Sequence, residues 1–340
     1  MFNLLVERLS FQRYEIYLMN FSAQRLLLLG ANGQLGHQLA VQLQQLGEVK
    51  ALTRAEADLA NPAALRKALT ELAQTFQPTV IVNAAAYTAV DKAQTETELA
   101  HAVNAESPAV LAELAKVWNA TLVHYSTDYV FDGSGTQPWQ ESDTTHPLSV
   151  YGQSKRDGEL AIAAQCPKHL ILRTSWVVGA HGGNFLKTML RLAAERDALR
   201  VVADQIGAPT STELLADVTA HALRQLQTRP ELAGLYHCIA SGETTWHGLA
   251  CLTAQVAIQA GASLKVNPDA IKPILAVEYP LPAPRPMNSR MSSDKLRLAL
   301  VGSQVNDSNS YNEEAGIIEF PGWEAMVREY VSKLAQNKLI

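Results

Sequence analysis

Two side chains that could together donate a proton stand four residues apart, Tyr151 and Lys155. On a helix this spacing places both on one face. A phenol, with a pKa of ~10, is too weak an acid for this task unless a neighbouring cation stabilises its anion. A hydroxyl at a nearby strand end, Thr127 or Ser126, would bond the oxygen that receives the proton. The pattern predicts proton donation to a carbonyl oxygen that accompanies hydride transfer.

A glycine-rich turn earlier in the sequence could bind the dinucleotide that donates the hydride. An apolar run, Leu26-Leu27-Leu28-Leu29, is followed by Gly30, Gly33 and Gly36. In a strand–turn–helix unit, such glycines allow the tight turn, the approach of phosphates and the packing of helix on strand. The alternative is a glycine-rich turn without a ligand. We predict dinucleotide binding by Gly30, Asn32, Gly33, Gln34, Leu35, Gly36, Arg54, Asp58, Leu59, Ala84, Ala85, Ala86, Tyr87, Thr88, Tyr125, Tyr151 and Lys155.

The end of the second predicted strand indicates which dinucleotide is used. It carries Arg54 and no acid, which favours the 2′-phosphate of NADPH over the free ribose of NADH. A solvated surface arginine is the alternative, so NADH stays open. Asp58 could meet the adenine amino group or only the dipole of the next helix. The small residues 84–86 at the third strand end could admit a flat ring, or serve helix–sheet packing.

The elements that must position these residues alternate along the chain. Strands are predicted at 25–29, 49–52, 79–83, 121–125 and 170–173, with helices at 34–45, 61–72, 98–118 and 154–164. This alternation is typical of an α/β fold with a doubly wound parallel sheet. We expect an N-terminal extension at 1–24, a dinucleotide-binding domain at 25–176 and a smaller, mainly substrate-binding lobe at 177–340. In the second half we predict helices at 185–194, 213–227, 246–260 and 324–336, and strands at 200–202 and 236–239. We also predict a proline-rich loop at 273–291 and a surface insertion at 302–316.

Composition excludes several classes of protein. The 340 residues are 47% hydrophobic and 18% charged with a formal net charge of -5, which argues against nucleic-acid binding. No window approaches the roughly 18 apolar residues of a membrane span. Three scattered cysteines, Cys166, Cys238 and Cys251, indicate reduced thiols and a cytoplasmic location. Residues 1–24 are predicted to be an extra helix or arm, or to precede a true start at Met19.

Longer segments make a family resemblance specific. They include Val82-Asn83-Ala84-Ala85-Ala86-Tyr87, His124-Tyr125-Ser126-Thr127-Asp128-Tyr129-Val130-Phe131, Ser149-Val150-Tyr151-Gly152-Gln153-Ser154-Lys155, Arg173-Thr174-Ser175-Trp176 and Arg285-Pro286-Met287-Asn288. The chain resembles the extended short-chain dehydrogenase/reductases, and among them the dTDP-4-dehydrorhamnose reductases. The similarity runs from about Leu26 to about Lys295 and resumes at Trp323.

This resemblance implies reduction of dTDP-4-dehydro-6-deoxy-L-mannose to dTDP-L-rhamnose. Whether the protein is a monomer or a homodimer is left open by the sequence. Tyr151 would donate the proton, Lys155 would lower its pKa and Thr127 would bond the sugar oxygen. The nucleotide sugar would also be contacted by Asp128, Trp176, Asn184 and Arg285. A core aromatic is the alternative for Trp176, and a structural pair with a carboxylate is the alternative for Arg285.

Some family members hold Mg²⁺ at a dimer interface through acidic side chains. Glu213 and Glu324 match two such positions, but the third carries Gln38, which weakens the prediction of a metal. Two rival functions follow from the same resemblance. One is a nucleotide-sugar dehydratase or epimerase, although Tyr129 stands where dehydratases carry an acid. The other is a non-catalytic, dinucleotide-binding regulatory subunit, against which the presence of Thr127, Tyr151 and Lys155 argues.

Overall fold

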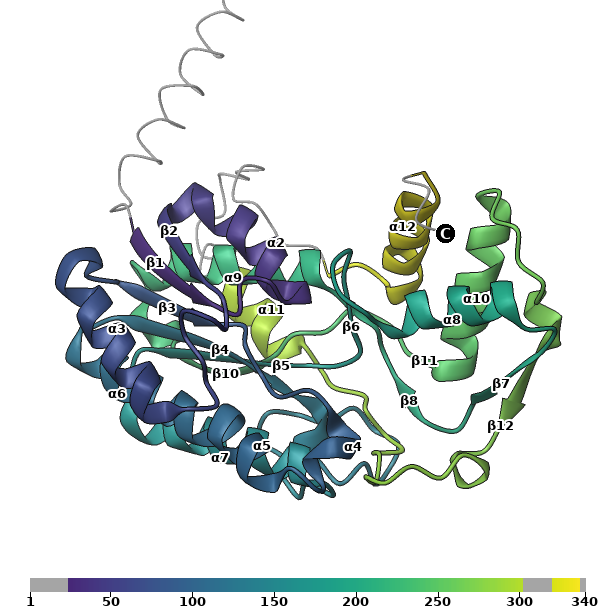
Figure 1. The fold of residues 1–340 in the computed structure, drawn as a ribbon, viewed down its shortest axis with the longest axis horizontal. Coiled ribbons are helices and arrows are strands. Elements are labelled where there is room, and N and C mark those ends of the chain that lie inside the picture. Colours follow the sequence, from purple (N-terminus) through teal and green to yellow (C-terminus); the bar gives the residue numbers. More distant parts are fainter. Residues whose placement is uncertain (1–23, 302–319, 337–340) are drawn as a thin grey trace, which may run out of the picture.

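A six-stranded parallel sheet forms the centre of the molecule. The computed structural model describes residues 24–301 and 320–336. Its sheet has the strand order β10-β5-β4-β3-β1-β2 (Figure 1). The strands are β1 (Gln24–Leu29), β2 (Gly47–Leu52), β3 (Val80–Asn83), β4 (Thr121–Thr127), β5 (His169–Thr174) and β10 (Gly234–His237). Since β2 and β3 lie on opposite sides of β1, the strand order reverses there and leaves a crevice beyond the strand ends.

Helices cover both faces of this sheet (Figure 1). One face packs against α3 (Pro62–Phe76), α6 (Ser107–Val117) and α7 (Val150–Gln165), and the other against α2 (Gln34–Gln42), α9 (Thr212–Leu226) and α11 (Asp294–Val301). The leucines of β1 alternate between the two cores, Leu26 and Leu28 in one and Leu27 and Leu29 in the other. A strand buried on both faces therefore explains the continuous apolar run.

A smaller lobe lies beyond the carboxyl ends of the strands (Figure 1). Its helices are α8 (Phe185–Glu195), α10 (Trp246–Gln259) and α12 (Trp323–Gln336). Short strand pairs join them: β6 (Val177–Val178) with β9 (Thr210–Ser211), β7 (Leu199–Val202) with β12 (Ile271–Ile274), and β8 (Ile206–Gly207) with β11 (Thr244–Thr245). Two apolar clusters of its own hold this lobe together.

The second half of the chain also returns to the large sheet. Strand β10 pairs in parallel with β5, and α9 packs its leucines against those of α2. Leu39 and Leu43 of the first helical segment thus share a core with Leu215 and Val218. The sheet and the site at its edge are therefore built from both halves of the chain.

The predicted α/β fold with a doubly wound parallel sheet is confirmed, with local differences. The single helix expected at 98–118 consists of α5 (Thr97–His101), a π-helical turn (Ala102–Glu106) and α6. The proline-rich stretch expected as a loop at 273–291 begins within β12, which ends at Ile274, and α11 was not predicted. The expected extension at 1–24 and insertion at 302–316 lie outside the described residues, apart from Gln24. No helix in the described ranges has the length and apolarity to cross a bilayer.

Candidate active site

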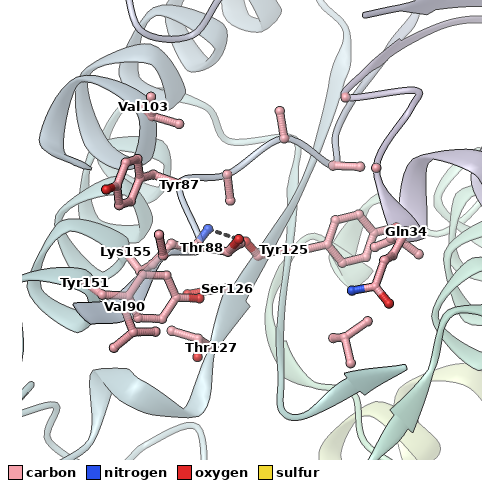
Figure 2. Close-up of a pocket in the computed structure, with 18 of the residues that line it drawn as sticks. Gln34, Tyr87, Thr88, Val90, Val103, Tyr125, Ser126, Thr127, Tyr151 and Lys155 are labelled. Atoms are coloured by element: carbon pink, nitrogen blue, oxygen red, sulfur yellow. Dashed lines mark hydrogen bonds between the residues drawn. The ribbon is translucent and has the colours of Figure 1, made fainter. Parts of the chain in front are cut away.

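A cavity of about 840 Å³ opens at the carboxyl ends of the parallel strands. Residues that follow β1, β2 and β3 line one part of it, and the ends of β4 and β5 line another. Figure 2 shows Tyr151, Lys155, Ser126 and Thr127 gathered on one side, with Gln34 and Tyr125 on the other. The glycine turn and the tyrosine–lysine pair, about 120 residues apart in sequence, therefore face one space.

The glycine turn has the geometry of an anion-binding site. Gly30 has φ +79°, and a Cβ there would lie 2.7 Å from the backbone nitrogen of Ala85. A Cβ on Gly36 would lie 2.0 Å from the carbonyl oxygen of Gly30, so helix α2 approaches the turn as closely as the backbone allows. Gly33 gives α2 no side-chain cap, and the first turn holds no acid. The N-terminal N–H groups of α2 are thus oriented for an external anion such as a pyrophosphate.

Arg54 and Asp58 line the cavity beyond β2. They form an ion pair with 3.2 Å between Arg54 Nε and Asp58 Oδ1, and the Arg54 side chain is 75% exposed. An ion pair so exposed contributes little to stability, so the guanidinium can be redirected to a ligand at small cost. The three small residues Ala84, Ala85 and Ala86 also line the cavity, and they follow β3, on the other side of β1 from this rim.

The first turn of α7 positions Tyr151. The helix begins at Val150, four residues before the predicted start, because the Ser149 hydroxyl accepts the Gly152 N–H at 3.2 Å. The Tyr151 ring packs edge-on against Tyr129, with centroids 5.5 Å apart. One turn later, the buried Lys155 donates from Nζ to the carbonyl oxygen of Tyr125 at 2.6 Å (Figure 2). The predicted shared helical face is confirmed.

Burial alters the acidity of the groups around the cavity. It raises the pKa of Tyr151 to about 12, an effect that Thr127 partly offsets. Burial also lowers the pKa of Lys155 to about 8, against the attraction of Glu159. The pKa of Asp128 rises to about 6, again because the carboxyl is desolvated. A phenol, an amine and a carboxyl that titrate away from their usual ranges in one cavity are typical of a catalytic site.

Three buried oxygens at the ends of β4 and β5 have no hydrogen-bond partner among the described residues. They are Ser126 Oγ, Asp128 Oδ2 and Thr174 Oγ1, and all three residues line the cavity. Buried polar atoms are normally paired, because an unpaired one costs free energy. These oxygens therefore suit a ligand rich in hydroxyl groups.

Two stacked indoles close another side of the cavity. Trp176 and Trp246 both line it, with ring centroids 3.7 Å apart and an angle of 18° between the planes. Trp176 has φ +46°, a left-handed conformation that is strained for a bulky residue. Backbone strain of this kind is concentrated at functional sites. Trp176 lines the cavity and is half-buried, and it also packs against the apolar core of the smaller lobe.

Most of the predicted site residues line this cavity. The exceptions are Gly36, Asn184, Arg285, Glu213 and Glu324. Asn184 caps α8 and donates from Nδ2 to the Gly179 carbonyl oxygen at 2.9 Å. Arg285 forms a two-pronged ion pair with Asp91, with nitrogen–oxygen distances of 2.6 and 2.8 Å. The alternative considered for Arg285, a structural pair with a carboxylate, is the arrangement observed.

The predicted metal ligands lie on two helices. Glu213 is in the first turn of α9 and Glu324 in the first turn of α12. Among the residues that the structure describes, no group of three or more His, Cys, Asp or Glu side chains could hold a metal ion. The geometry of a single chain thus adds no support for Mg²⁺.

Sequence reasoning missed several lining residues. Trp246 begins α10, and no local pattern in the sequence marks it as a partner of Trp176. Thr174 could have been found, because it ends a strand that the sequence already places beside the one carrying Thr127. Of the three cysteines, Cys166 and Cys238 are buried, while Cys251 is only half-buried.

Known proteins resemble the chain over most of its length. Residues 24–333 match the model of the RmlD substrate binding domain. A Salmonella typhimurium protein named dTDP-4-dehydrorhamnose reductase is 50% identical over 272 residues, 80% of this chain and 90% of its own length. An Escherichia coli K12 protein of the same name is 47% identical over 292 residues, 85% of this chain and 97% of its own length.

Solved structures agree with these relatives. The dTDP-4-dehydrorhamnose reductase of Bacillus anthracis, solved in complex with NADP, has a TM-score of 0.77 at 31% identity and covers 92% of this chain and 100% of its own. A Thermus thermophilus UDP-glucose 4-epimerase, at 18% identity and a TM-score of 0.69 over 90% of this chain and 97% of its own, shares the fold. From the match over residues 24–333 and these identities, the chain belongs to the RmlD substrate binding domain family, with the dTDP-4-dehydrorhamnose reductases.

Proposed function

We propose that this protein reduces dTDP-4-dehydro-6-deoxy-L-mannose to dTDP-L-rhamnose with NADPH. The observation that carries the proposal is the single cavity that joins the glycine turn to Tyr151 and Lys155. A dinucleotide seated on the turn would extend toward this pair, as ligands do at the strand-order reversal of such sheets. The relatives named above support the choice of substrate.

The chain's own residues would have separate tasks in this reaction. A bound reduced nicotinamide supplies the hydride. Tyr151 gives its phenolic proton to the ketone oxygen, which becomes the hydroxyl of the product. Lys155 in its ammonium form stabilises the phenolate that remains, and Thr127 bonds the same sugar oxygen. A general acid held in place in this way contributes about a hundred- to ten-thousand-fold in rate.

Recognition of the nucleotide sugar would use the remaining polar and aromatic surface. The unpaired oxygens of Ser126, Asp128 and Thr174 can accept hydrogen bonds from sugar hydroxyls. The Ser126 and Thr174 hydroxyls can also donate hydrogen bonds to them. The Trp176–Trp246 stack offers a flat apolar face to a sugar or base. Direct substrate contacts by Asn184 and Arg285 remain predictions without support from the geometry, since neither lines the cavity.

Cofactor choice and assembly belong to the proposal as well. Arg54 at the cavity rim suits the 2′-phosphate of NADPH, and the NADP complex of the Bacillus anthracis relative agrees with this preference. Four other expectations remain predictions: Mg²⁺ binding by Glu213 and Glu324, a monomeric or homodimeric state, a domain boundary at residue 176, and a cytoplasmic location. Size measurement with and without Mg²⁺ tests the metal and the assembly together.

One assay separates this function from its rivals. Purified protein is mixed with dTDP-4-dehydrorhamnose, and the absorbance of NADPH and of NADH is followed in parallel. Consumption of one NADPH for each rhamnose nucleotide formed is expected. Sugar conversion without net cofactor oxidation would indicate a dehydratase or epimerase. Dinucleotide binding without any turnover would indicate a regulatory subunit.

A further inference from the structure

A series of buried polar groups leads from the backbone just after β3 to the amine of Lys155. The backbone N–H of Ala85 donates to Asn83 Oδ1 at 3.2 Å. Asn83 Nδ2 lies 3.1 Å from His124 Nδ1, and His124 Nε2 lies 3.2 Å from Lys155 Nζ. Asn83, His124 and Lys155 are all at least 98% buried, and Asn83 and His124 lie behind the cavity rather than in its lining.

The first link gives this series a fixed direction. A backbone N–H can only donate, so the amide of Asn83 must turn its oxygen to Ala85 and its NH₂ to His124. The Nδ1 atom of His124 is therefore the acceptor of that NH₂ group. A neutral imidazole carries its proton on one nitrogen only, and here that nitrogen is Nε2. The N–H of Nε2 points at Lys155 Nζ.

This direction acts against a charged lysine. An ammonium has three N–H groups and no lone pair, so it cannot accept the Nε2–H of His124. A neutral amine has one lone pair and can accept it while donating to the Tyr125 carbonyl at 2.6 Å. If Lys155 were charged, His124 would lie between two donors, Asn83 and Lys155. Its one acceptor nitrogen, Nδ1, already accepts from Asn83, so the ammonium would find no acceptor on the imidazole. Buried groups feel such a mismatch strongly, because no water replaces the lost bond.

The histidine itself stays neutral. Burial and the nearby Lys155 hold the pKa of His124 well below its usual range. The other groups around Lys155 on α7 are Tyr151, which is uncharged while protonated, and Glu159. Glu159 attracts the ammonium, but Arg173 on β5 already pairs with it through two bonds of 2.7 and 2.8 Å. The nearby Asp128 acts on Tyr151 rather than on the amine.

We propose that His124 is a positioning residue for the tyrosine–lysine pair: held by Asn83, it presents its Nε2–H to Lys155 and so sets the pH at which that side chain becomes charged. The inference deepens the proposed function, since it concerns how the proton-donating pair is poised. Its tests measure the protein without substrate, so they are independent of whether the reductase assay succeeds.

The tautomer of His124 is the most direct test, and it needs no variant. In ¹⁵N-histidine-labelled protein, the two ring nitrogens of a neutral imidazole have well-separated chemical shifts, and each tautomer is recognised by which nitrogen carries the proton. We expect His124 to be protonated on Nε2 and not to titrate between pH 5 and 8. Protonation on Nδ1, or titration within that range, would overturn the proposal.

A pair of variants tests the effect on Lys155, followed through the ¹³Cε shift of labelled lysine. In wild-type protein we expect a midpoint near the pKa of about 8. Asn83→Asp replaces the donor with an acceptor, which moves the imidazole proton to Nδ1 and leaves Nε2 free to accept from the ammonium. The midpoint should then rise by about one pH unit.

Asn83→Asp in a His124→Phe background shows whether the effect passes through the imidazole. Without the imidazole, the substitution at position 83 cannot change the hydrogen bond to Lys155. The increase in the Lys155 midpoint should then be less than half of that in the wild-type background. An equal rise in both backgrounds would show that the new carboxylate acts through space, and the proposal would be wrong. His169→Gln is the matched control: His169 starts β5, bonds the Cys166 carbonyl and is not part of the series that leads to Lys155, so its loss should leave the midpoint unchanged.

Discussion

Replacing Tyr151 with phenylalanine removes one hydroxyl and preserves the ring. In Tyr151→Phe the edge-on contact with Tyr129 and the Ser149 cap of α7 remain, so we expect the free energy of unfolding to change by no more than about 1 kcal/mol. The glycine turn is untouched, and the dissociation constant for NADPH should stay within about twofold. The variant therefore isolates the loss of the proton donor.

The structure indicates how large the loss of rate should be. The other acid near the reacting oxygen is Asp128, whose pKa is raised to about 6. At pH 7.5 only a few per cent of that carboxyl would be protonated, so it cannot replace the phenol. We expect kcat to fall by about a hundred- to ten-thousand-fold, a rise in the activation barrier of about 2.7–5.5 kcal/mol.

The assay is NADPH oxidation at pH 7.5 under substrate saturation, with dinucleotide binding measured separately by fluorescence. Tyr236→Phe is the matched control, because its buried hydroxyl donates to the Leu232 carbonyl at 3.0 Å, in the sheet but outside the cavity lining. It should lower the free energy of unfolding by about 1 kcal/mol and leave kcat unchanged. A Tyr151→Phe enzyme with kcat within about threefold of wild type would refute the assigned role.

Three further results are expected. Arg54→Ala should raise KM for NADPH by about tenfold and leave KM for NADH nearly unchanged, since only NADPH carries the 2′-phosphate; equal changes in steady-state assays would contradict this role. Gly36→Ala places a Cβ 2.0 Å from the Gly30 carbonyl oxygen and should weaken dinucleotide binding by more than about tenfold, whereas Gly183→Ala, with nothing within 4 Å, should bind normally in titrations. The rate should fall as pH rises through about 8, because the ammonium form of Lys155, present below its pKa of about 8, is lost above it; a flat pH–rate profile from 7 to 9.5 would argue against its catalytic use.

The elements around the glycine turn were predictable because their signals are local. A run of leucines buried on both faces indicates a central parallel strand, and glycines at three-residue spacing mark the turn that follows it. Spacing alone also placed Tyr151 and Lys155 on one helical face. What joins them to the turn is the parallel order of the strands, which the alternation of elements implies.

The remaining features depend on contacts between distant residues. Arg285 pairs with Asp91 across 194 residues, and no pattern around either residue announces the partner. The long helix expected at 98–118 contains a π-helical turn at the place where Asn104 meets α7. There the two backbones are so close that a Cβ on Gly158 would lie 2.1 Å from the Asn104 carbonyl oxygen. The direction imposed on His124 likewise arises from a backbone N–H that the sequence does not reveal.

The return of β10 and α9 to the sheet bears on how the protein is made. When only the first 176 residues have emerged from the ribosome, β5 is an exposed sheet edge and the leucines of α2 are uncovered. In the complete protein β10 pairs with that edge and α9 packs on those leucines. An open edge and bare apolar surface on a nascent chain promote association with other chains. Translation must proceed beyond His237 before the six-stranded sheet is complete, so a premature stop between β5 and β10 should yield aggregates rather than a working fragment.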